Sequence, residues 1–235
     1  QMVENLPIPA EQLHCAYTKI APLPVGARVL AVGVQREDLT AFLDGTRADG
    51  IEPTFLCLDG LALLSLLPYL PATAPSTTRL VIWAENNHAN LVVATDGLPS
   101  VVRTVSLSEP LVPGSEVPPS LLREVLLTAT AVSESGVGIQ ETWVAGPAAE
   151  AMVEPLTDLL HVPCGVLDAA NLAIDGASSL SGLSPRLTMA VAAAVGEVVR
   201  EGAGSLNLRV GSFSREEGYS LFRERFNYFA IAALV

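Results

Sequence analysis

The sequence predicts an α/β protein with two related lobes, and three observations support this prediction. The chain has 235 residues, of which 50% are hydrophobic, and this is enough for one large domain or two small ones. Segments with the alternating apolar pattern of strands recur between segments with helical spacing. The order of these elements repeats along the chain, with strands first and helices after them, which is typical of a layered α/β fold.

The first part of the sequence predicts a pair of strands followed by a helix. β-branched and alternating apolar residues predict strands over 13–20 and 27–34, joined by a connection that contains Pro and Gly. Acidic residues follow, and apolar side chains then recur at helical spacing, which predicts a helix over 36–50. The apolar positions of this helix are Leu39, Phe42 and Leu43.

The next segment leads to the clearest linker in the chain. Residues 51–60 are predicted to form a strand, and Asp59 is placed to cap a short helix over 60–70. The stretch PATAPSTT at 71–78 consists of Pro, Ala, Thr and Ser, a composition typical of linkers. We therefore expect a boundary between two lobes at this stretch.

The second part predicts three antiparallel strands followed by alternating helices and strands. Asn-Asn and Asp-Gly turn signals separate the three strands, so two tight hairpins are expected. The predicted strands cover 79–85, 88–96 and 98–108. Helix, strand, helix and short strand are then predicted at 118–135, 141–146, 147–160 and 163–168. A last helix over 184–202 is apolar on most sides, and such a helix is expected to be buried.

Charge and cysteine content exclude several classes of protein. The net charge of −12 and the single lysine, Lys19, argue against a nucleic-acid-binding surface. Cys15, Cys57 and Cys164 lie far apart, so neither a zinc site nor a disulfide framework is predicted. The opening residues lack the basic start and apolar core of a signal peptide. A protein of the reducing cytoplasm fits these features best.

Several short phrases, in this order and spacing, resemble one family. They are LHCAYTKI, RADGIEPTFLCLDGLAL, VVRTVSLSE, SPRLTMAVAAAVGEVV and LNLRVGSF. Together they resemble the cytoplasmic part of protein L of bacterial type II secretion, and also the actin-like protein M of type IV pilus assembly. The resemblance implies the two-lobe, actin-like ATPase (ribonuclease H-like) fold, with the first strands of the first lobe missing ahead of Gln1.

The resemblance also implies how the chain is divided and where it resides. Residues 1–74 would be the remainder of the first lobe, and 78–182 the second lobe. Residues 183–212 would supply a closing helix and strand, and 213–235 a juxtamembrane segment with the start of a truncated transmembrane helix. The protein would then lie at the cytoplasmic face of the bacterial inner membrane.

The end of the chain carries the residues expected at the membrane. An apolar run reaches Val235, but a spanning helix needs roughly 20 such residues. If the helix continues, Arg223 and Arg225 belong on the cytoplasmic side of the membrane. The aromatic rings expected at the membrane interface are Phe226, Tyr228 and Phe229. The alternative is an ordinary core segment at a chain end.

Nucleotide hydrolysis is not expected from the sequence. Actin-like ATPases carry an Asp-X-Gly turn where this chain reads WAENNHANL, and only Glu85 there could hold a metal. Paired glycines near the adenosine pocket are replaced by Gly146 and Pro147, and proline removes a backbone donor. No cofactor, metal site or catalytic residue is therefore predicted, while weak nucleotide binding stays open.

Other reactive side chains have plainer explanations. His14 and Cys15 are neighbours on a predicted strand, so they point to opposite faces and cannot act as a base and a nucleophile together. His161 follows a predicted helix, where a histidine at the end suits the helix dipole. Trp83 and Trp143 lie on predicted central strands and are expected in the core.

The function that these features imply is that of a scaffold and not of an enzyme. By resemblance, its partners would be the secretion ATPase of the type II protein E class, the inner-membrane platform proteins and the membrane itself, with a homodimer also possible. An acidic chain suits a partner surface with positive charge. The main alternative is an ATP-binding pilus-assembly protein that acts as a nucleotide-dependent switch, and a sugar-kinase-like enzyme ranks last.

Overall fold

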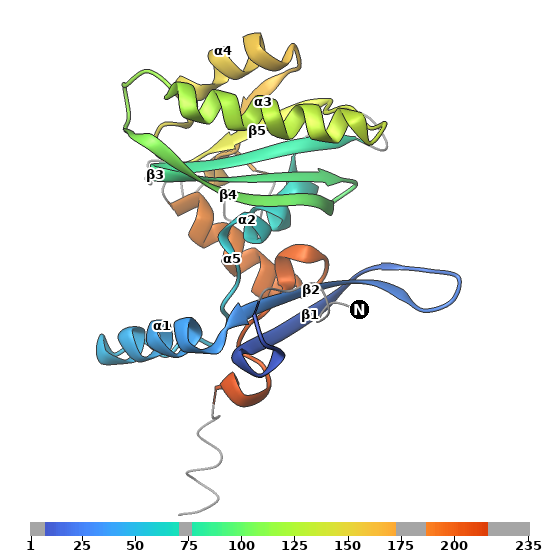
Figure 1. Ribbon diagram of the computed structural model, residues 1–235, viewed down its shortest axis with the longest axis vertical. Coiled ribbons are helices and arrows are strands. Elements are labelled where there is room, and N and C mark those ends of the chain that lie inside the picture. The colour runs from blue at the N-terminus through green and yellow to red at the C-terminus, as the bar shows by residue number, and fades with distance from the viewer. Residues whose placement is uncertain (1–7, 71–76, 173–186, 216–235) are drawn as a thin grey trace, which may run out of the picture. The chain divides into compact units, whose positions relative to one another are not determined.

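The computed structural model of the chain describes residues 8–70, 77–172 and 187–215 (Figure 1). These residues belong to two compact units. Unit 1 takes its described residues from 8–16, 32–56 and 207–215. Unit 2 takes them from 17–31, 57–70, 77–172 and 187–206.

A two-stranded sheet and one helix come first in the chain. After a short 3-10 turn at Ala10–Gln12, strands β1 (Leu13–Pro22) and β2 (Ala27–Gln35) pair with each other. Helix α1 (Arg36–Ala48) begins at once with two acidic residues in its first turn, where they favour the positive end of the helix dipole. These elements confirm the predicted strand pair and helix.

The buried face of α1 is narrower than the sequence predicts. Leu39 and Leu43 are buried, but Phe42 is 52% exposed. The helix ends just before Gly50, whose φ of +77° is a backbone conformation that glycine adopts readily. Leu39 and Leu43 therefore form the buried stripe of α1, and Phe42, which shares their helical spacing, lies at its margin.

The strand predicted over 51–60 is not formed. Residues 51–58 have no regular secondary structure, and the chain then enters helix α2 (Asp59–Ala62) and the 3-10 helix η3 (Leu63–Tyr69). Asp59 is the first residue of α2 and makes no side-chain cap, so the predicted cap is also wrong. The backbone of this segment instead finds partners in the side chain and backbone of residues 207 and 208.

The main sheet lies in unit 2 and has the order β4-β3-β5-β6. Strands β5 (Glu141–Ala145) and β6 (Cys164–Val166) run parallel to the start of β3 (Thr78–Thr95). Strand β4 (Leu98–Leu111) runs antiparallel to the end of β3. The two ends of β3 therefore have different partners.

Strand β3 turns back on itself in its middle. The Thr78 and Thr95 hydroxyl oxygens lie 2.8 Å apart although 17 residues separate them, and a straight strand would place these residues about 56 Å apart. Asp96 also donates its N–H to the carbonyl of Thr77 at 3.4 Å. The reversal falls at Asn86, which has a φ of +53°. Both predicted hairpins are thus confirmed, one at Asn86 and one at Gly97 (φ +77°).

Helices cover both faces of this sheet (Figure 1). Helix α3 (Pro119–Glu134) starts with proline, which suits the first position of a helix, and α4 (Ala149–Leu160) follows β5. Together with β3 and β4 they enclose the largest apolar core of the described residues. Its fully buried side chains include Leu80, Ile82, Leu91, Leu121, Val125, Val144, Met152 and Leu156. α2 contacts β3 and β4 from the opposite face.

Helix α5 (Leu187–Val199) packs on α2 and η3 through small residues. A Cβ at Gly196 would lie 2.4 Å from the carbonyl oxygen of Gly204, and one at Gly204 would lie 2.0 Å from Ser65 Oγ. These backbones therefore approach as closely as glycine permits. Thr188, Ala192 and Gly196 of α5 are buried and Val191, Ala193 and Val195 are half-buried, whereas Val198 near its end is 80% exposed, so the helix is buried over part of its surface.

Short 3-10 turns complete the described chain. They cover Ala169–Asn171, Ala203–Ser205 and Gly211–Phe213. The closing strand that the sequence predicts within 183–212 is absent from the described residues, and 206–210 have no regular secondary structure.

Candidate functional site

The turn at Asn86 lies at the end of the sheet where an actin-like ATPase would hold phosphate groups. The first half of β3 ends at this turn, and β5, which is parallel to it, ends at Ala145. Because the carboxyl ends of parallel strands meet at one sheet edge, the turn and the residues after β5 are neighbours. A Cβ at Gly146 would lie only 2.4 Å from the carbonyl oxygen of Ala84, which shows how closely the two approach.

The backbone at this edge offers few donors to an anion. Pro147 has no N–H, and the N–H groups of Ala149 and Ala151 already donate to the carbonyls of Gly146 and Ala148, at 3.2 and 3.1 Å. Glu150 adds a negative charge in the first turn of α4. Phosphate binding at a helix start depends on free N–H groups and a positive end, so this arrangement is poorly suited to it.

The turn itself is polar but lacks the flexible residue of a phosphate loop. Asn86, Asn87 and His88 are exposed, and Glu85 is half-buried. Asn86 supplies the left-handed conformation that a glycine would otherwise supply. The sequence prediction placed these residues in one turn, and the structure confirms that position.

The other sequence candidates stay apart from one another. His14 is buried and Cys15 is exposed on the opposite face of β1, as the strand alternation predicts. His161 ends α4 with a φ of +55°, so it forms the left-handed cap of the helix. Trp83 is 3% exposed on β3, and Trp143 is half-buried on β5, where its ring covers Gly165.

Two of the three cysteines, Cys57 and Cys164, have the features of inert thiols. Burial, with the nearby negative charge of Asp59, raises the pKa of Cys57 to about 11, and burial raises that of Cys164 to about 11. Such thiols stay protonated at neutral pH and are poor nucleophiles. Among the described residues, no group of three His, Cys, Asp or Glu side chains is placed to hold a metal ion.

The most extensively bonded polar feature is a segment that the sequence analysis treated as a strand. We call residues 207–213 the closing segment. The side chain of Asn207 accepts hydrogen bonds from the N–H groups of Leu56 and Arg209, at 3.0 and 2.9 Å, and donates to the carbonyl of Thr54 at 3.3 Å. Leu208 adds a backbone bond to Leu56 at 2.7 Å. One asparagine side chain thus replaces the ladder that a strand pair would make.

The closing segment is also bonded to the start of β1. His14, which is buried, lies with Nε2 2.8 Å from the carbonyl oxygen of Leu208. Its ring meets the ring of Phe213 edge to face, with centroids 4.8 Å apart. Arg36 stacks over the same ring at 5.8 Å and donates to Ser212. Three parts of unit 1, distant in sequence, therefore converge on these seven residues.

A buried arginine completes this arrangement. Arg209 is 7% exposed and donates from its guanidinium to Glu52, which also accepts from Arg47 at 3.2 Å. Partial burial raises the pKa of Glu52, but the hydrogen bonds and charges of Arg47 and Arg209 lower it by more, so the net pKa lies below its usual value. Glu52 and Arg209 are 157 positions apart in the sequence, and no local pattern could have revealed their pairing.

The residues expected at the membrane interface, Arg223, Arg225, Phe226, Tyr228 and Phe229, lie outside the described residues. Residues 71–76 of the predicted linker lie outside them as well. None of the described helices combines the length and the apolar character needed to cross a bilayer.

Comparisons with known proteins identify the fold. No family model and no curated protein matches the chain. Among solved structures, it is similar to a chain of a PilM-PilN type IV pilus biogenesis complex, with a TM-score of 0.61 and 15% identity over 80% of this chain and 67% of that one. A Bacteroides thetaiotaomicron protein of actin-like ATPase fold and unknown function gives a TM-score of 0.40 and 10% identity over 70% and 57%. The chain thus has the α/β, actin-like fold that the sequence analysis predicts.

Proposed function

We propose that this chain is a non-catalytic scaffold of a bacterial secretion or pilus-assembly machine, of the kind represented by protein L of type II secretion. In this role the actin-like part lies at the cytoplasmic face of the inner membrane. It recruits the secretion ATPase and links it to the platform proteins of that membrane. The fold shared with a chain of a PilM-PilN complex supports the assignment to this class of machine.

The observation that carries the proposal is the edge formed by Asn86 and Gly146. Actin-like ATPases need glycine-rich turns and free backbone donors at this edge. Here an asparagine forms the turn, Pro147 removes one donor, and Ala149 and Ala151 use theirs within the protein. An edge with these features is expected to bind phosphate poorly, and this expectation supports a scaffold over an ATPase.

The closing segment supports the proposed link to the membrane. It is the last bonded part of the described chain before residues 216–235, which hold the predicted membrane-interface residues. Polar contacts of Asn207, His14 and Arg209 join the closing segment to the rest of unit 1. Whatever follows Arg215 is therefore attached to a well-bonded part of the protein.

The test of recruitment uses two chain lengths. The full protein and a chain that ends at Ser214 are each mixed with the cognate secretion ATPase and also expressed in cells for membrane fractionation. We expect both to bind the ATPase, while only the full protein brings it to the membrane. If the chain that ends at Ser214 binds no ATPase of the secretion or pilus class, the scaffold proposal fails.

The nucleotide-dependent switch remains the second candidate, because Gly146 still lies directly against the end of the first half of β3. Thermal unfolding of the full protein with and without Mg-ATP separates the two. A ligand at a hundred times its Kd stabilises by about 2.7 kcal/mol, and we expect no such shift. A clear shift that Glu85→Gln removes would favour the switch.

A further inference from the structure

Strand β4 forms an edge of the unit 2 sheet. In the described residues it stands at one end of the order β4-β3-β5-β6. One side of β4 is paired with β3, and no strand of the described residues is paired with its other side. The register with β3 is regular from Val101, which pairs with Val93, to Ser106, which pairs with His88, and the next pair is Leu111 with Asn86. Between these two pairs, β4 covers five positions whereas β3 covers two, so β4 bulges out of the ladder. Edge strands with unpaired backbone groups are sites where another chain can add a strand.

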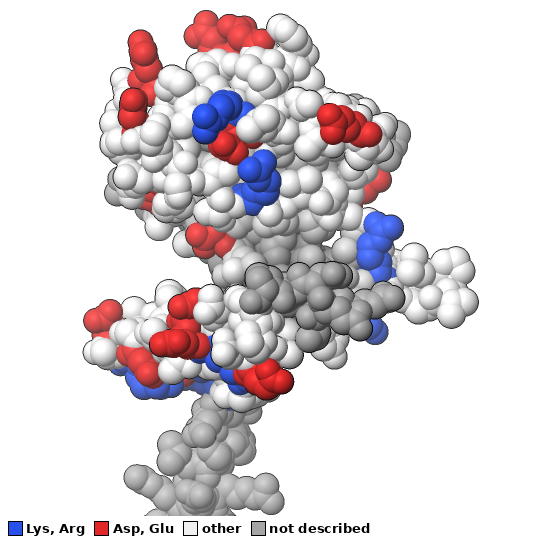
Figure 2. Space-filling model, in the orientation of Figure 1, with Lys and Arg blue, Asp and Glu red and all other residues white. Residues whose placement is uncertain are grey.

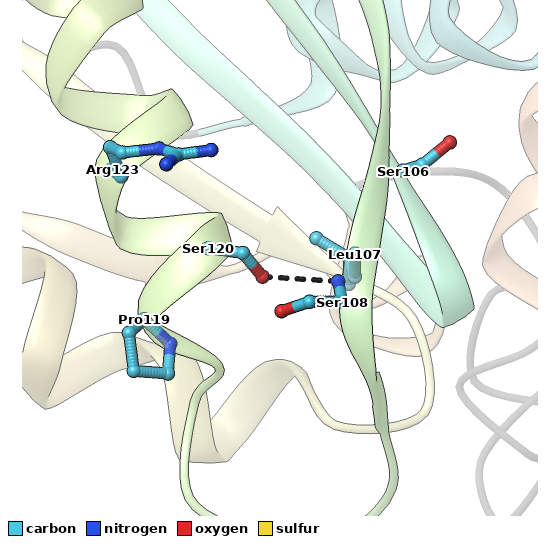
Figure 3. A pocket seen from close by; sticks show the side chains of 6 residues that line it. All are labelled: Ser106, Leu107, Ser108, Pro119, Ser120 and Arg123. Atoms are coloured by element: carbon cyan, nitrogen blue, oxygen red, sulfur yellow. Dashed lines mark hydrogen bonds between the residues drawn. The ribbon is translucent and has the colours of Figure 1, made fainter.

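A pocket lies beside this irregular part of β4 (Figure 3). Its volume is about 510 Å³, which is within the range of ligand-binding pockets. It lies between β4 and the first turns of α3, and its lining residues are Ser106, Leu107, Ser108, Pro119, Ser120 and Arg123. One wall is therefore the backbone of an edge strand.

The backbone N–H groups of this wall make few strong hydrogen bonds within the protein. The N–H of Ser108 donates to Ser120 Oγ at 3.4 Å, a long hydrogen bond. If donors alternate regularly from Ser106 to Ser108, the N–H of Ser106 points to the same side as that of Ser108. The next position of this set is Pro110, which has no N–H. Added pairing would thus be confined to the part of β4 that precedes Pro110.

The charge at the pocket is opposite to that of the chain as a whole. Acidic side chains are spread widely over the face drawn in Figure 2, and the net charge is −12. Arg103 and Arg123 nevertheless both lie beside Glu124, from β4 and α3. Glu124 is paired with Arg103 at 3.0 Å, whereas Arg123 reaches it only at 3.5 Å and has a side chain that is 72% exposed. Arg123 is therefore free to pair with an incoming carboxylate.

The helix next to the pocket adds apolar surface on the same side. Leu126 and Leu127 follow Arg123 by three and four residues, so all three share one face of α3. The two leucines are 47% and 52% exposed. A ligand seated on the β4 edge with its acid on Arg123 could thus bury apolar side chains there.

From these features we propose that the β4 edge and its pocket bind an extended, acidic segment of a partner protein. The segment adds as a strand along Ser106–Ser108, replaces the long bond from Ser108 to Ser120, and places a carboxylate against Arg123. Apolar residues of the segment that alternate with its acids cover Leu126 and Leu127. Main-chain bonds give affinity in this mode of recognition, and pockets for side chains give specificity.

A library of random ten-residue peptides displayed on phage tests the proposal with the full protein as the target. We expect the selected peptides to be rich in Asp and Glu alternating with β-branched residues. The Kd of a selected synthetic peptide, measured by fluorescence anisotropy, should rise at least tenfold in Arg123→Glu. The matched control is Arg200→Glu, because Arg200 is 79% exposed and pairs with Glu197 at 3.3 Å, and it should leave the Kd unchanged.

Two further measurements test the strand addition itself. Ser106→Pro removes a donor on the outer side of β4, which an edge strand tolerates, and should abolish binding while far-UV circular dichroism stays unchanged. If that variant does not fold, amide exchange in the unchanged protein decides, because the N–H groups of Ser106 and Ser108 should slow when peptide binds. Selected peptides that are basic, that bind Arg123→Glu equally well or that leave these amides unprotected would overturn the proposal, as would a selection that enriches none.

Discussion

Unit 2 and unit 1 differ in what holds them together. Unit 2 has a hydrogen-bonded sheet with helices on both faces and a core of fully buried side chains such as Leu91, Leu121 and Met152. In unit 1, the buried apolar residues described are few, namely Leu13, Ala16, Leu39, Leu43 and Leu208. Its parts are joined mainly by polar side chains that cross long distances in sequence. We therefore expect the stability of unit 2 to depend mainly on apolar burial. The stability of the closing segment should depend mainly on hydrogen bonds and charge.

The largest expected effect is in the core of unit 2. Leu121→Ala removes a fully buried side chain of α3 and leaves a cavity, which should lower the free energy of unfolding by about 3 kcal/mol. Urea unfolding followed by circular dichroism measures this loss. Leu126→Ala, on the exposed side of the same helix, is the matched control and should cost far less. Equal losses would mean that α3 does not enclose a packed core.

A smaller and more local effect is expected in unit 1. Asn207→Ala removes the partners of Leu56 N–H, Arg209 N–H and the Thr54 carbonyl, and unmade hydrogen bonds of this kind cost about 2 kcal/mol. Amide exchange of Leu56 and Leu208 should accelerate roughly thirtyfold, while the amides of β5 stay unchanged. Acceleration spread over both units would contradict the distinction between them.

Acid should release the closing segment before it affects the core. Since the folded pKa of Glu52 lies below its ordinary value of 4.5, the folded state binds fewer protons there. Its contribution is complete above that ordinary value and is lost as the pH falls through the lower folded pKa. Proteolysis after Arg209, measured against pH, should therefore increase only below about pH 4.5. In Glu52→Gln this pH dependence should disappear.

The smallest expected change in stability concerns the backbone conformation at one helix end. It involves neither apolar burial nor the polar contacts of the closing segment. His161 ends α4 in the left-handed region with a φ of +55°, which glycine adopts without steric cost. His161→Gly should raise the free energy of unfolding by up to about 1 kcal/mol. Thermal unfolding measures the gain, and His88→Gly in the exposed turn is a control. A loss of stability in His161→Gly would show that the ring makes a contact that matters.

The sequence predicts the elements of unit 2 well because their signals are local. Alternating apolar residues define β3, β4 and β5, and the Asn86 and Gly97 turns follow from the chemistry of their residues. Pro119 likewise marks the start of α3. In each case the residues that decide the structure lie within a few positions of one another.

Prediction fails where distant residues decide. The segment 51–60 has the composition of a strand, but the side chain of Asn207, 151 residues away from Leu56, satisfies its backbone. His14 and Leu208 are 194 residues apart. Helix α5 is apolar on most sides, yet its small residues allow one close contact at Gly196 and leave Val198 exposed. The polar network of unit 1 could not be predicted because no single stretch contains it.

The closing segment has a mechanical consequence. A pull on the chain beyond Arg215 is transmitted first to Phe213 and Arg209, whose contacts with His14, Arg36 and Glu52 are all within unit 1. Within unit 1 the load is shared between a stacked ring, an ion pair and the bonds of Asn207. Tension at this end of the chain would thus be borne by side-chain contacts and not by the backbone ladder of a sheet.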